Sequence, residues 1–204
     1  MKAIKFIILG IMLLSATVSF GQTGIRAGIN MANEIKSFSW EDISENLTTN
    51  NLIGYQIGVV QQVMSKKNNL GIEAGILLSQ KGYTFIDNTT NNNCYKEINF
   101  LEIPLNLRCQ VKLGAIGIFG YGGMYAAYSL GGKIVDESTN ESQSINYPRF
   151  YDRLDYGYNI GAGVEFFKKI QLAGVWAQGL KNTSINPDNS SMNRVLSVNL
   201  TYLF

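Results

Sequence analysis

The sequence predicts an all-β protein: an eight-stranded antiparallel up-and-down transmembrane β-barrel with long extracellular loops and short periplasmic turns. Three observations support this fold class. After residue 21, segments with alternating apolar and polar residues recur, and none has the length and 3.6-residue period of an amphipathic helix. Long polar connections alternate with tight turns, as in membrane barrels. The closing stretch NRVLSVNLTYLF alternates strictly, which predicts a strand that is held in a sheet.

The N-terminal segment has the features of a secretory signal peptide. Two lysines precede the apolar run FIILGIMLL, and small residues lie three and one positions before a cleavage site between Gly21 and Gln22. The run is too short to cross a bilayer as a helix. We therefore expect residues 1–21 to be removed on export, with an uncleaved anchor as the alternative. Residues 22–204 then form one outer-membrane β-barrel domain.

Removal of this segment also changes the charge balance. It takes away two of the 17 basic residues and none of the 15 acidic ones, so the mature chain has equal numbers of each. A nucleic-acid partner is disfavoured, because it would require a basic excess concentrated on one surface.

The predicted strands follow one another along the mature chain. They cover residues 23–33, 52–63, 69–83, 97–111, 115–129, 153–167, 170–181 and 193–204. The first four, the sixth and the eighth each have one apolar row; these rows contain Ile25, Ile57, Ile72, Leu105, Ile160 and Leu200. The fifth and seventh are apolar or glycine-rich on both rows, so the pattern assigns no side to them. All eight are long enough to cross a membrane as tilted strands.

The connections predict the orientation of the barrel. The long ones cover residues 34–51, 84–96, 130–152 and 182–192, and the tight ones are SKKNN, KLGA and a turn at Lys168 and Lys169. Membrane barrels place long loops outside the cell and short turns in the periplasm. An even number of strands returns the chain to the side of the membrane on which the first strand began. We therefore expect the final strand to pair with the first and to turn its apolar row towards lipid.

Charged residues fall on the rows opposite the apolar ones: Arg26, Glu73, Glu102, Arg108, Asp155 and Glu165. We expect them to point into the barrel as a structural network, because charges inside a lipid-surrounded tube must pair. An acid–base site built from these carboxylates is the alternative. The chain has no histidine, which excludes Ser-His-Asp and Cys-His catalysis and the usual His-based metal sites. We expect no catalytic residue, cofactor or metal.

Aromatic residues near the strand ends predict an interfacial girdle: Tyr55, Tyr83, Phe85, Phe119, Tyr121, Trp176, Tyr202 and Phe204. The glycines and charges of the opposite rows suit the crowded interior of a narrow barrel, in which side chains nearly fill the space. Bulk diffusion through the lumen is therefore not expected. A soluble lipocalin-like barrel, with its apolar rows inside, is the alternative to the membrane barrel.

The connections also carry candidate contact residues. Phe38 and Trp40 lie in the first long loop, as anchors for a partner or as side chains that rest on the barrel mouth. Lysines gather in the tight turns: Lys66, Lys67, Lys112, Lys168 and Lys169. They either meet anionic lipid headgroups or keep the turns soluble.

The two cysteines are not expected to form a disulfide. Cys94 lies in a polar stretch, and Cys109 lies in the far part of the predicted strand that follows it. At about 3.3 Å per residue their α-carbons would be tens of ångströms apart, well beyond the roughly 7 Å limit for a disulfide.

Several stretches resemble the PorT-like outer-membrane β-barrel family: GIRAGINMAN, FLEIPLNLR, YGGMYAAYSLGGK, LDYGYNIGAGVEF, AQGLKN and LTYLF. The most specific are LEIPL and the combination of DYGYNIGAGVE with the closing aromatic. The resemblance implies an eight-stranded barrel in the outer membrane of a Gram-negative bacterium. It also implies that Tyr202 and Phe204 form a C-terminal signal for the barrel-insertion machinery, and it brings no catalytic residues.

The sequence as a whole predicts a monomeric, non-enzymatic barrel that contacts outer-membrane lipids and has a structural or surface-interaction role through its extracellular loops. The alternatives are a subunit of a protein-secretion or envelope complex, as in one branch of the PorT-like family, and the soluble ligand-binding barrel.

Overall fold

The computed structural model describes residues 21–36, 50–65, 68–86, 92–139, 141–147, 150–181 and 191–204. Most of these residues lie in strands. The elements are β1 (Gln22–Lys36), β2 (Asn50–Met64), β3 (Leu70–Ile86), β4 (Asn93–Leu113), β5 (Ile116–Asp136), β6 (Ser142–Ser144), the 3₁₀ helix η1 (Phe150–Arg153), β7 (Leu154–Phe166), β8 (Ile170–Gly179) and β9 (Ser191–Leu203). Within the described residues, no helix is long and apolar enough to cross a membrane.

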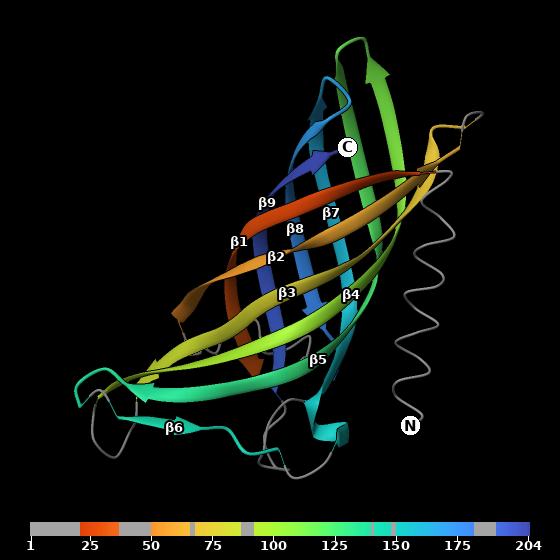
Figure 1. Ribbon diagram of the computed structural model, residues 1–204. Helices are drawn as coiled ribbons and strands as arrows, with labels where there is room; N and C mark the ends of the chain where they lie inside the picture. The colour runs from red at the N-terminus through yellow and green to blue at the C-terminus, as the bar shows by residue number, and fades with distance from the viewer. Residues whose placement is uncertain are drawn as a thin grey trace, which may run out of the picture.

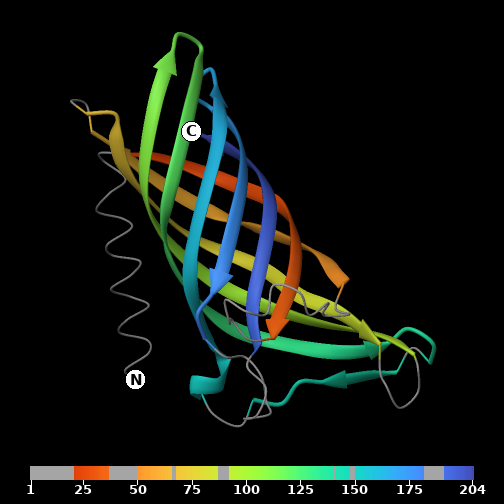
Figure 2. The same ribbon diagram turned by 180° about the vertical axis from the view of Figure 1, so that it is seen from behind.

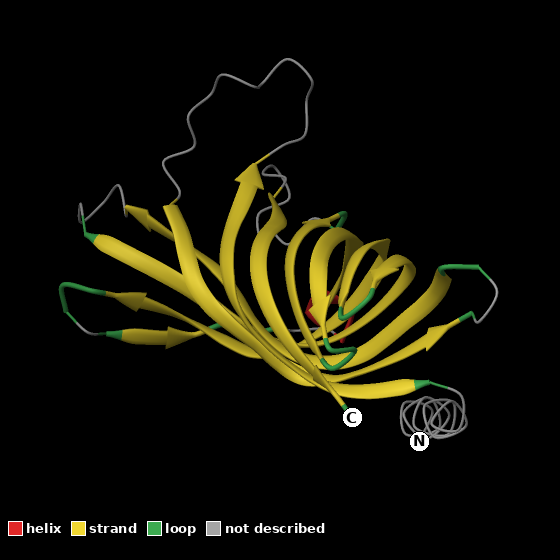
Figure 3. Cartoon of the chain, turned by 90° about the horizontal axis from the view of Figure 1, so that it is seen from above, coloured by secondary structure: helices red, strands yellow, loops and turns green. Residues whose placement is uncertain are grey.

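The long strands close into a ring, which Figures 1 and 2 show from opposite sides and Figure 3 from above. The order around the ring is β1, β2, β3, β4, β5, β7, β8, β9 and back to β1, with every neighbouring pair antiparallel. At the seam, Gly24 pairs with Leu203, and the amide of Phe204 donates to the carbonyl of Thr23 at 2.8 Å. The predicted closed eight-stranded barrel is confirmed, and its last strand has no free edge.

The barrel has apolar rows outside and polar rows inside. On β4, Leu107 is 72% exposed, whereas the next residue, Arg108, is 1% exposed. On β9, Leu200 is 55% exposed and Asn199 is 1% exposed. Water is a poor solvent for such an outer surface, and hydrocarbon suits it. The arrangement is the reverse of the one that the soluble lipocalin-like alternative requires.

The structure assigns sides to the fifth predicted strand, which the sequence pattern left open. On β5, Ile118 and Met124 face outwards and are more than half exposed. Phe119, Tyr121 and Tyr125 face inwards and are at most 5% exposed. The placement of Phe119 and Tyr121 in the interfacial girdle is therefore wrong, because both rings fill the lumen.

Glycines on β7 make room for these rings. The direct cross-strand partners are Phe119 with Gly163, Tyr121 with Gly161, and Tyr125 with Gly157. A Cβ atom on Gly161 would lie only 2.7 Å from Cζ of Tyr121, and one on Gly163 would lie 2.6 Å from Cζ of Phe119. The alternation of glycine along DYGYNIGAGVE thus leaves the space that the aromatic row of β5 occupies.

Several strands continue into segments that were predicted to be loops, and β5 continues furthest. β4 begins at Asn93, inside the predicted loop 84–96, and β5 runs to Asp136, inside the predicted loop 130–152. That second loop also contains β6, which pairs with the end of β5. The register between β4 and β5 shifts next to Asn99. Beyond this point apolar and polar residues are mixed on both faces of these strands, so periodicity did not detect the extension.

The tight turns differ in backbone strain. The β4–β5 turn uses Gly114 at a φ of 68°, which glycine adopts freely. In the β7–β8 turn, Phe167 and Lys168 have φ values of 53° and 60°, the sign pattern of a type I′ turn. Such turns normally carry asparagine and glycine, and a bulky residue in this region costs about 1–3 kcal/mol.

The two cysteines lie near opposite ends of β4. Cys94 is buried near the start of the strand, and Cys109 is exposed on its outer row. Neither thiol is part of a disulfide.

Candidate functional site

Four charged side chains meet inside the barrel near the short turns. We call Arg26, Glu73, Arg108 and Glu165 the turn-side cluster. Glu73 lies 2.9 Å from Nη2 of Arg26 and 3.4 Å from Nη1 of Arg108. Nη2 of Arg108 lies 3.8 Å from Oε2 of Glu165. All four side chains are at most 5% exposed, and their formal charges cancel.

Amide side chains complete the hydrogen bonding of the two carboxylates. Gln62 donates to Glu73 at 2.9 Å, while Gln110 and Gln171 donate to Glu165 at 2.7 and 2.8 Å. Every carboxylate oxygen of the turn-side cluster therefore has a donor or a cation beside it. Because each of these oxygens already has such a neighbour in a packed interior, this arrangement favours a structural network over an acid–base site.

A second group lies nearer the long loops. We call Lys81, Glu102 and Asp155 the loop-side cluster. Nζ of Lys81 lies 2.6 Å from Oε2 of Glu102 and 3.9 Å from Oδ2 of Asp155. The same ammonium lies 4.3 Å from the ring centroid of Tyr125. Asn193 donates to Asp155 at 3.0 Å. Lys81 and Asn193 thus stabilise the negative charges of Glu102 and Asp155.

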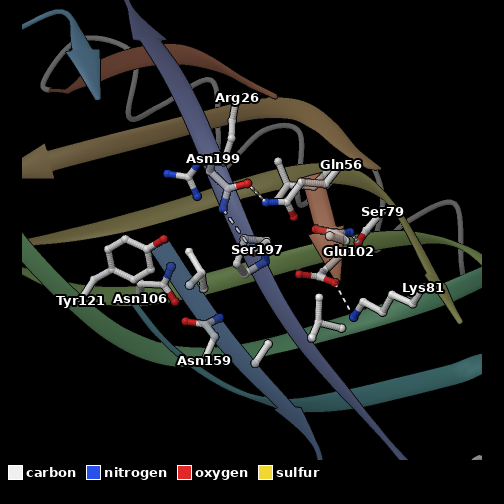
Figure 4. Close-up of a pocket in the computed structure, with 16 residues that line it drawn as sticks. Arg26, Gln56, Ser79, Lys81, Glu102, Asn106, Tyr121, Asn159, Ser197 and Asn199 are labelled. Carbon is white, nitrogen blue, oxygen red and sulfur yellow. Dashed lines mark hydrogen bonds and ion pairs between the residues drawn. The ribbon is translucent and has the colours of Figure 1, made fainter. Parts of the chain in front are cut away.

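A small polar cavity lies between the two clusters (Figure 4). Its volume is about 30 Å³, and its lining includes Arg26 from the turn-side cluster and both Lys81 and Glu102 from the loop-side cluster. Some polar atoms of its lining have no hydrogen-bond partner within the described residues: Oδ1 of Asn30, Asn106 and Asn159 and the hydroxyl of Tyr121. The volume suits one or two water molecules, which would supply the missing donors, and it is too small for a solute.

The structure brings the six charged residues predicted for the lumen into these two clusters. It also adds Lys81, which was not among the six predicted residues and which lies between Glu102 and Asp155. The alternation of β3 already placed Lys81 on the inner row, but periodicity along one strand does not reveal which side chains meet across the barrel. The glutamines at positions 62, 110 and 171 were missed for the same reason.

The other predicted residues lie elsewhere. Tyr202 and Phe204 are on the outer row at the end of β9, 46% and 67% exposed, with their ring centroids 5.6 Å apart. Phe38 and Trp40 lie outside the described residues, as do Lys66 and Lys67. Within the described chain, no group of three or more acidic or cysteine side chains is arranged to hold a metal ion.

The sheet continues beyond the apolar band at the loop end. On β3, the outward-facing residues are apolar up to Leu78, and the next one towards the loops is Gln80. On β4, they are apolar from Leu101 towards the turn, and the next one towards the loops is Asn99. Gln80 and Asn99 are direct cross-strand partners and mark the boundary. Beyond this pair lies what we call the loop-side sheet: residues 81–86 of β3, 93–98 of β4, 131–136 of β5, and β6. Figure 1 shows β5 and β6 extending away from the ring.

The tip of the loop-side sheet is held by Asp136. Its carboxylate accepts a hydrogen bond from the side chain of Asn92 at 2.9 Å and from the amide of Ser138 at 2.8 Å. These bonds, that from Asn92 first, lower the pKa of Asp136 below its usual value, so the carboxylate stays ionised to lower pH.

The segment after β6 folds back over the barrel mouth. The amide of Ile145 donates to the carbonyl of Gly132 at 2.9 Å, and Ile145 packs against the inner apolar group that contains Phe100. The guanidinium of Arg153 lies 5.2 Å from the ring centroid of Tyr147. This segment therefore covers part of the mouth, above a lumen that the side chains already fill.

A closed antiparallel barrel with an apolar outer surface, a charge-paired interior and short turns at one end is an integral outer-membrane β-barrel. Residues 19–184 match the family described as "Outer membrane protein beta-barrel domain". The chain belongs to this family, which places it in the outer membrane of a Gram-negative bacterium. In such barrels the short turns face the periplasm and the long loops face outwards.

Solved structures resemble this chain at low sequence identity. The outer membrane enzyme PagL has 12% identity and a TM-score of 0.51, with 88% of this chain and 98% of that chain covered. OprG from Pseudomonas aeruginosa has 14% identity and a TM-score of 0.49, covering 91% and 96%. Neisserial surface protein A has 6% identity and a TM-score of 0.49, covering 89% and 97%. The comparison with curated proteins found no match.

Proposed function

We propose that this protein is a non-enzymatic surface-interaction barrel whose loop-side sheet binds an extended segment of a partner protein outside the cell. The observation that carries the proposal is the continuation of four hydrogen-bonded strands beyond the Gln80–Asn99 pair. Crossing the membrane requires only about 9–11 residues per strand, whereas β4 and β5 have 21 each. The additional length serves no purpose in spanning the bilayer.

The edge of the loop-side sheet supports this mode of binding. β6 is the terminal strand in the sheet order, and its three residues are exposed. An edge strand offers backbone hydrogen-bonding groups to which an extended segment can add. The filled lumen, with about 30 Å³ of free space in its middle, argues against transport as the function.

The non-enzymatic assignment is supported by the residues present. The chain lacks histidine, and each carboxylate oxygen of the turn-side cluster has a donor or a cation beside it. The description of PagL as an enzyme belongs to that protein, and a likeness at 12% identity extends to the fold alone.

The experiment is photo-crosslinking on living cells that carry a photoreactive amino acid at Gln143. We expect partner adducts from this position in β6 and none from Val198, a matched position on the lipid-facing row of β9. Heat-dependent mobility in detergent gels verifies that both variants are folded barrels. Equal yields from the two positions, or no adduct from Gln143, would contradict the proposal.

Sequence features support further proposals about family branch, oligomeric state and export. LEIPL and DYGYNIGAGVE support a place in the PorT-like branch, where membership of a secretion or envelope complex is the rival function. Stoichiometric partners recovered from gently solubilised membranes would favour that rival. We further propose a monomer, cleavage between Gly21 and Gln22, and recognition of Tyr202 and Phe204 by the insertion machinery.

A further inference from the structure

The β7–β8 turn combines a strained backbone with an exposed ring. Phe167 and Lys168 both have positive φ, at positions where asparagine and glycine are the usual residues. The side chain of Phe167 is 73% exposed, so packing within the protein does not account for its presence. A strained, exposed aromatic residue indicates a contact outside the chain.

The turn is also held firmly in place. The amide of Phe167 donates to the carbonyl of Ala115 in the neighbouring turn at 2.8 Å, and the amide of Leu203 donates to the carbonyl of Lys169 at 2.7 Å. Figure 1 shows the β4–β5 and β7–β8 turns at the same end of the barrel as the C-terminus. The backbone that carries Phe167 is therefore held at the periplasmic end.

Three exposed lysines lie in or beside the same two turns. Lys112, Lys168 and Lys169 are exposed, as is Leu113 at 61%. Glu165, the acid nearest to the turn in sequence, is 3% exposed and accepts hydrogen bonds from Gln110 and Gln171 inside the barrel. These lysines are therefore available to an anion outside the protein.

We propose that Lys112, Leu113, Phe167, Lys168 and Lys169, which we call the periplasmic rim, form a binding surface for anionic phospholipid headgroups of the inner leaflet. The lysines attract the negative headgroups, while the aromatic ring lies at the boundary between headgroups and acyl chains. Lipid contact with the ring explains why phenylalanine occupies a turn position that disfavours it. This inference depends on the membrane-spanning fold and is independent of the partner proposed for the loop-side sheet.

The test places a fluorescent reporter in the periplasmic rim. Phe167→Trp is made in a chain with Trp40→Phe and Trp176→Phe, which removes both native tryptophans. The protein is reconstituted with brominated phosphatidylglycerol or brominated phosphatidylcholine, each diluted in unbrominated phosphatidylcholine. At low salt we expect the quenching to show that the anionic lipid associates about fivefold more tightly than the zwitterionic one. This is the effect of about one well-placed lysine. The preference should weaken as salt is added, because salt screens the charges.

The controls separate specific binding from general lipid contact. Lys112→Gln, Lys168→Gln and Lys169→Gln together should abolish the preference, whereas Lys133→Gln, in the loop-side sheet, should retain it. Phe167→Asn with Lys168→Gly should raise stability in detergent, because it relieves the turn. Equal quenching by the two lipids, a preference that survives loss of the three lysines, or no quenching at all would overturn the proposal. The last result would indicate that the ring faces water or a protein.

Discussion

Glu73 is the residue on which the turn-side cluster depends. One of its oxygens is bonded by Arg26 and Asn106, and the other by Gln62 and Arg108. Its side chain is fully buried, so the negative charge is stabilised by these neighbours and not by water. The same contacts hold β1, β2, β3 and β4 in register, which is a structural role for a charged group in a membrane barrel.

Replacing Glu73 should therefore be costly. Glu73→Gln keeps the shape of the side chain but leaves Arg26 and Arg108 without their central counter-charge, and we expect a loss of about 3–5 kcal/mol in the free energy of unfolding. The matched control is Glu97→Gln, which removes a partly exposed ion pair with Lys133 and should cost at most about 1 kcal/mol. Urea unfolding in lipid vesicles measures both, and similar losses would show that Glu73 is not central.

For single residues, the sequence predicts which side of the barrel wall a side chain faces better than it predicts which side chains it contacts. Alternation along each strand placed Arg26, Glu73 and Arg108 on inner rows, and all three are buried. It did not identify Lys81 as the cation between Glu102 and Asp155, because that contact depends on side chains from β3, β4 and β7 meeting across the lumen.

Among the elements, β5 and β7 form a pair of neighbouring strands in which large inner side chains lie opposite glycines. Each inner aromatic ring of β5 faces a glycine of β7 in direct register. Glycine by itself weakens a strand, because it has no side chain to pack. The aromatic rings offset this loss by packing over the glycines.

This matching predicts opposite effects for two glycine substitutions. Gly161→Ala should destabilise the barrel by about 1–3 kcal/mol, because its Cβ would lie 2.7 Å from Cζ of the buried Tyr121. Gly174→Ala, whose Cβ would meet no atom within 4 Å, should be neutral or stabilising by up to about 1 kcal/mol. Urea unfolding of the two variants measures the difference. If both behave alike, the inner rings do not need the glycines.

The elements also show where sequence periodicity fails. Both rows of β5 are rich in apolar residues and glycine, so the pattern could not tell which row faced lipid, and Phe119 and Tyr121 were wrongly assigned to the girdle. The loop-side sheet was missed because apolar and polar residues are mixed on both of its faces, and because the register between β4 and β5 shifts next to Asn99.

For the whole molecule, one cause explains two features: β9 pairs with β1, and the apolar rows face outwards instead of inwards as in a soluble barrel. In hydrocarbon every backbone group must find a partner within the protein, and a closed ring provides one for each. The alternation of the last strand and the alternating lengths of the connections were sufficient to predict this architecture. The partner that we propose for the loop-side sheet could not be predicted from the sequence, because exposed strands carry no comparable constraint.

The most direct test of this account is a nitroxide scan along β9, one labelled position at a time from Leu196 to Tyr202, in lipid vesicles. Oxygen, which concentrates in the bilayer, should reach labels at Leu196, Val198, Leu200 and Tyr202. Labels at Ser197, Asn199 and Thr201 should be shielded from it. An accessibility that alternates with the opposite phase, or that favours a water-soluble relaxation agent at every position, would contradict the membrane barrel.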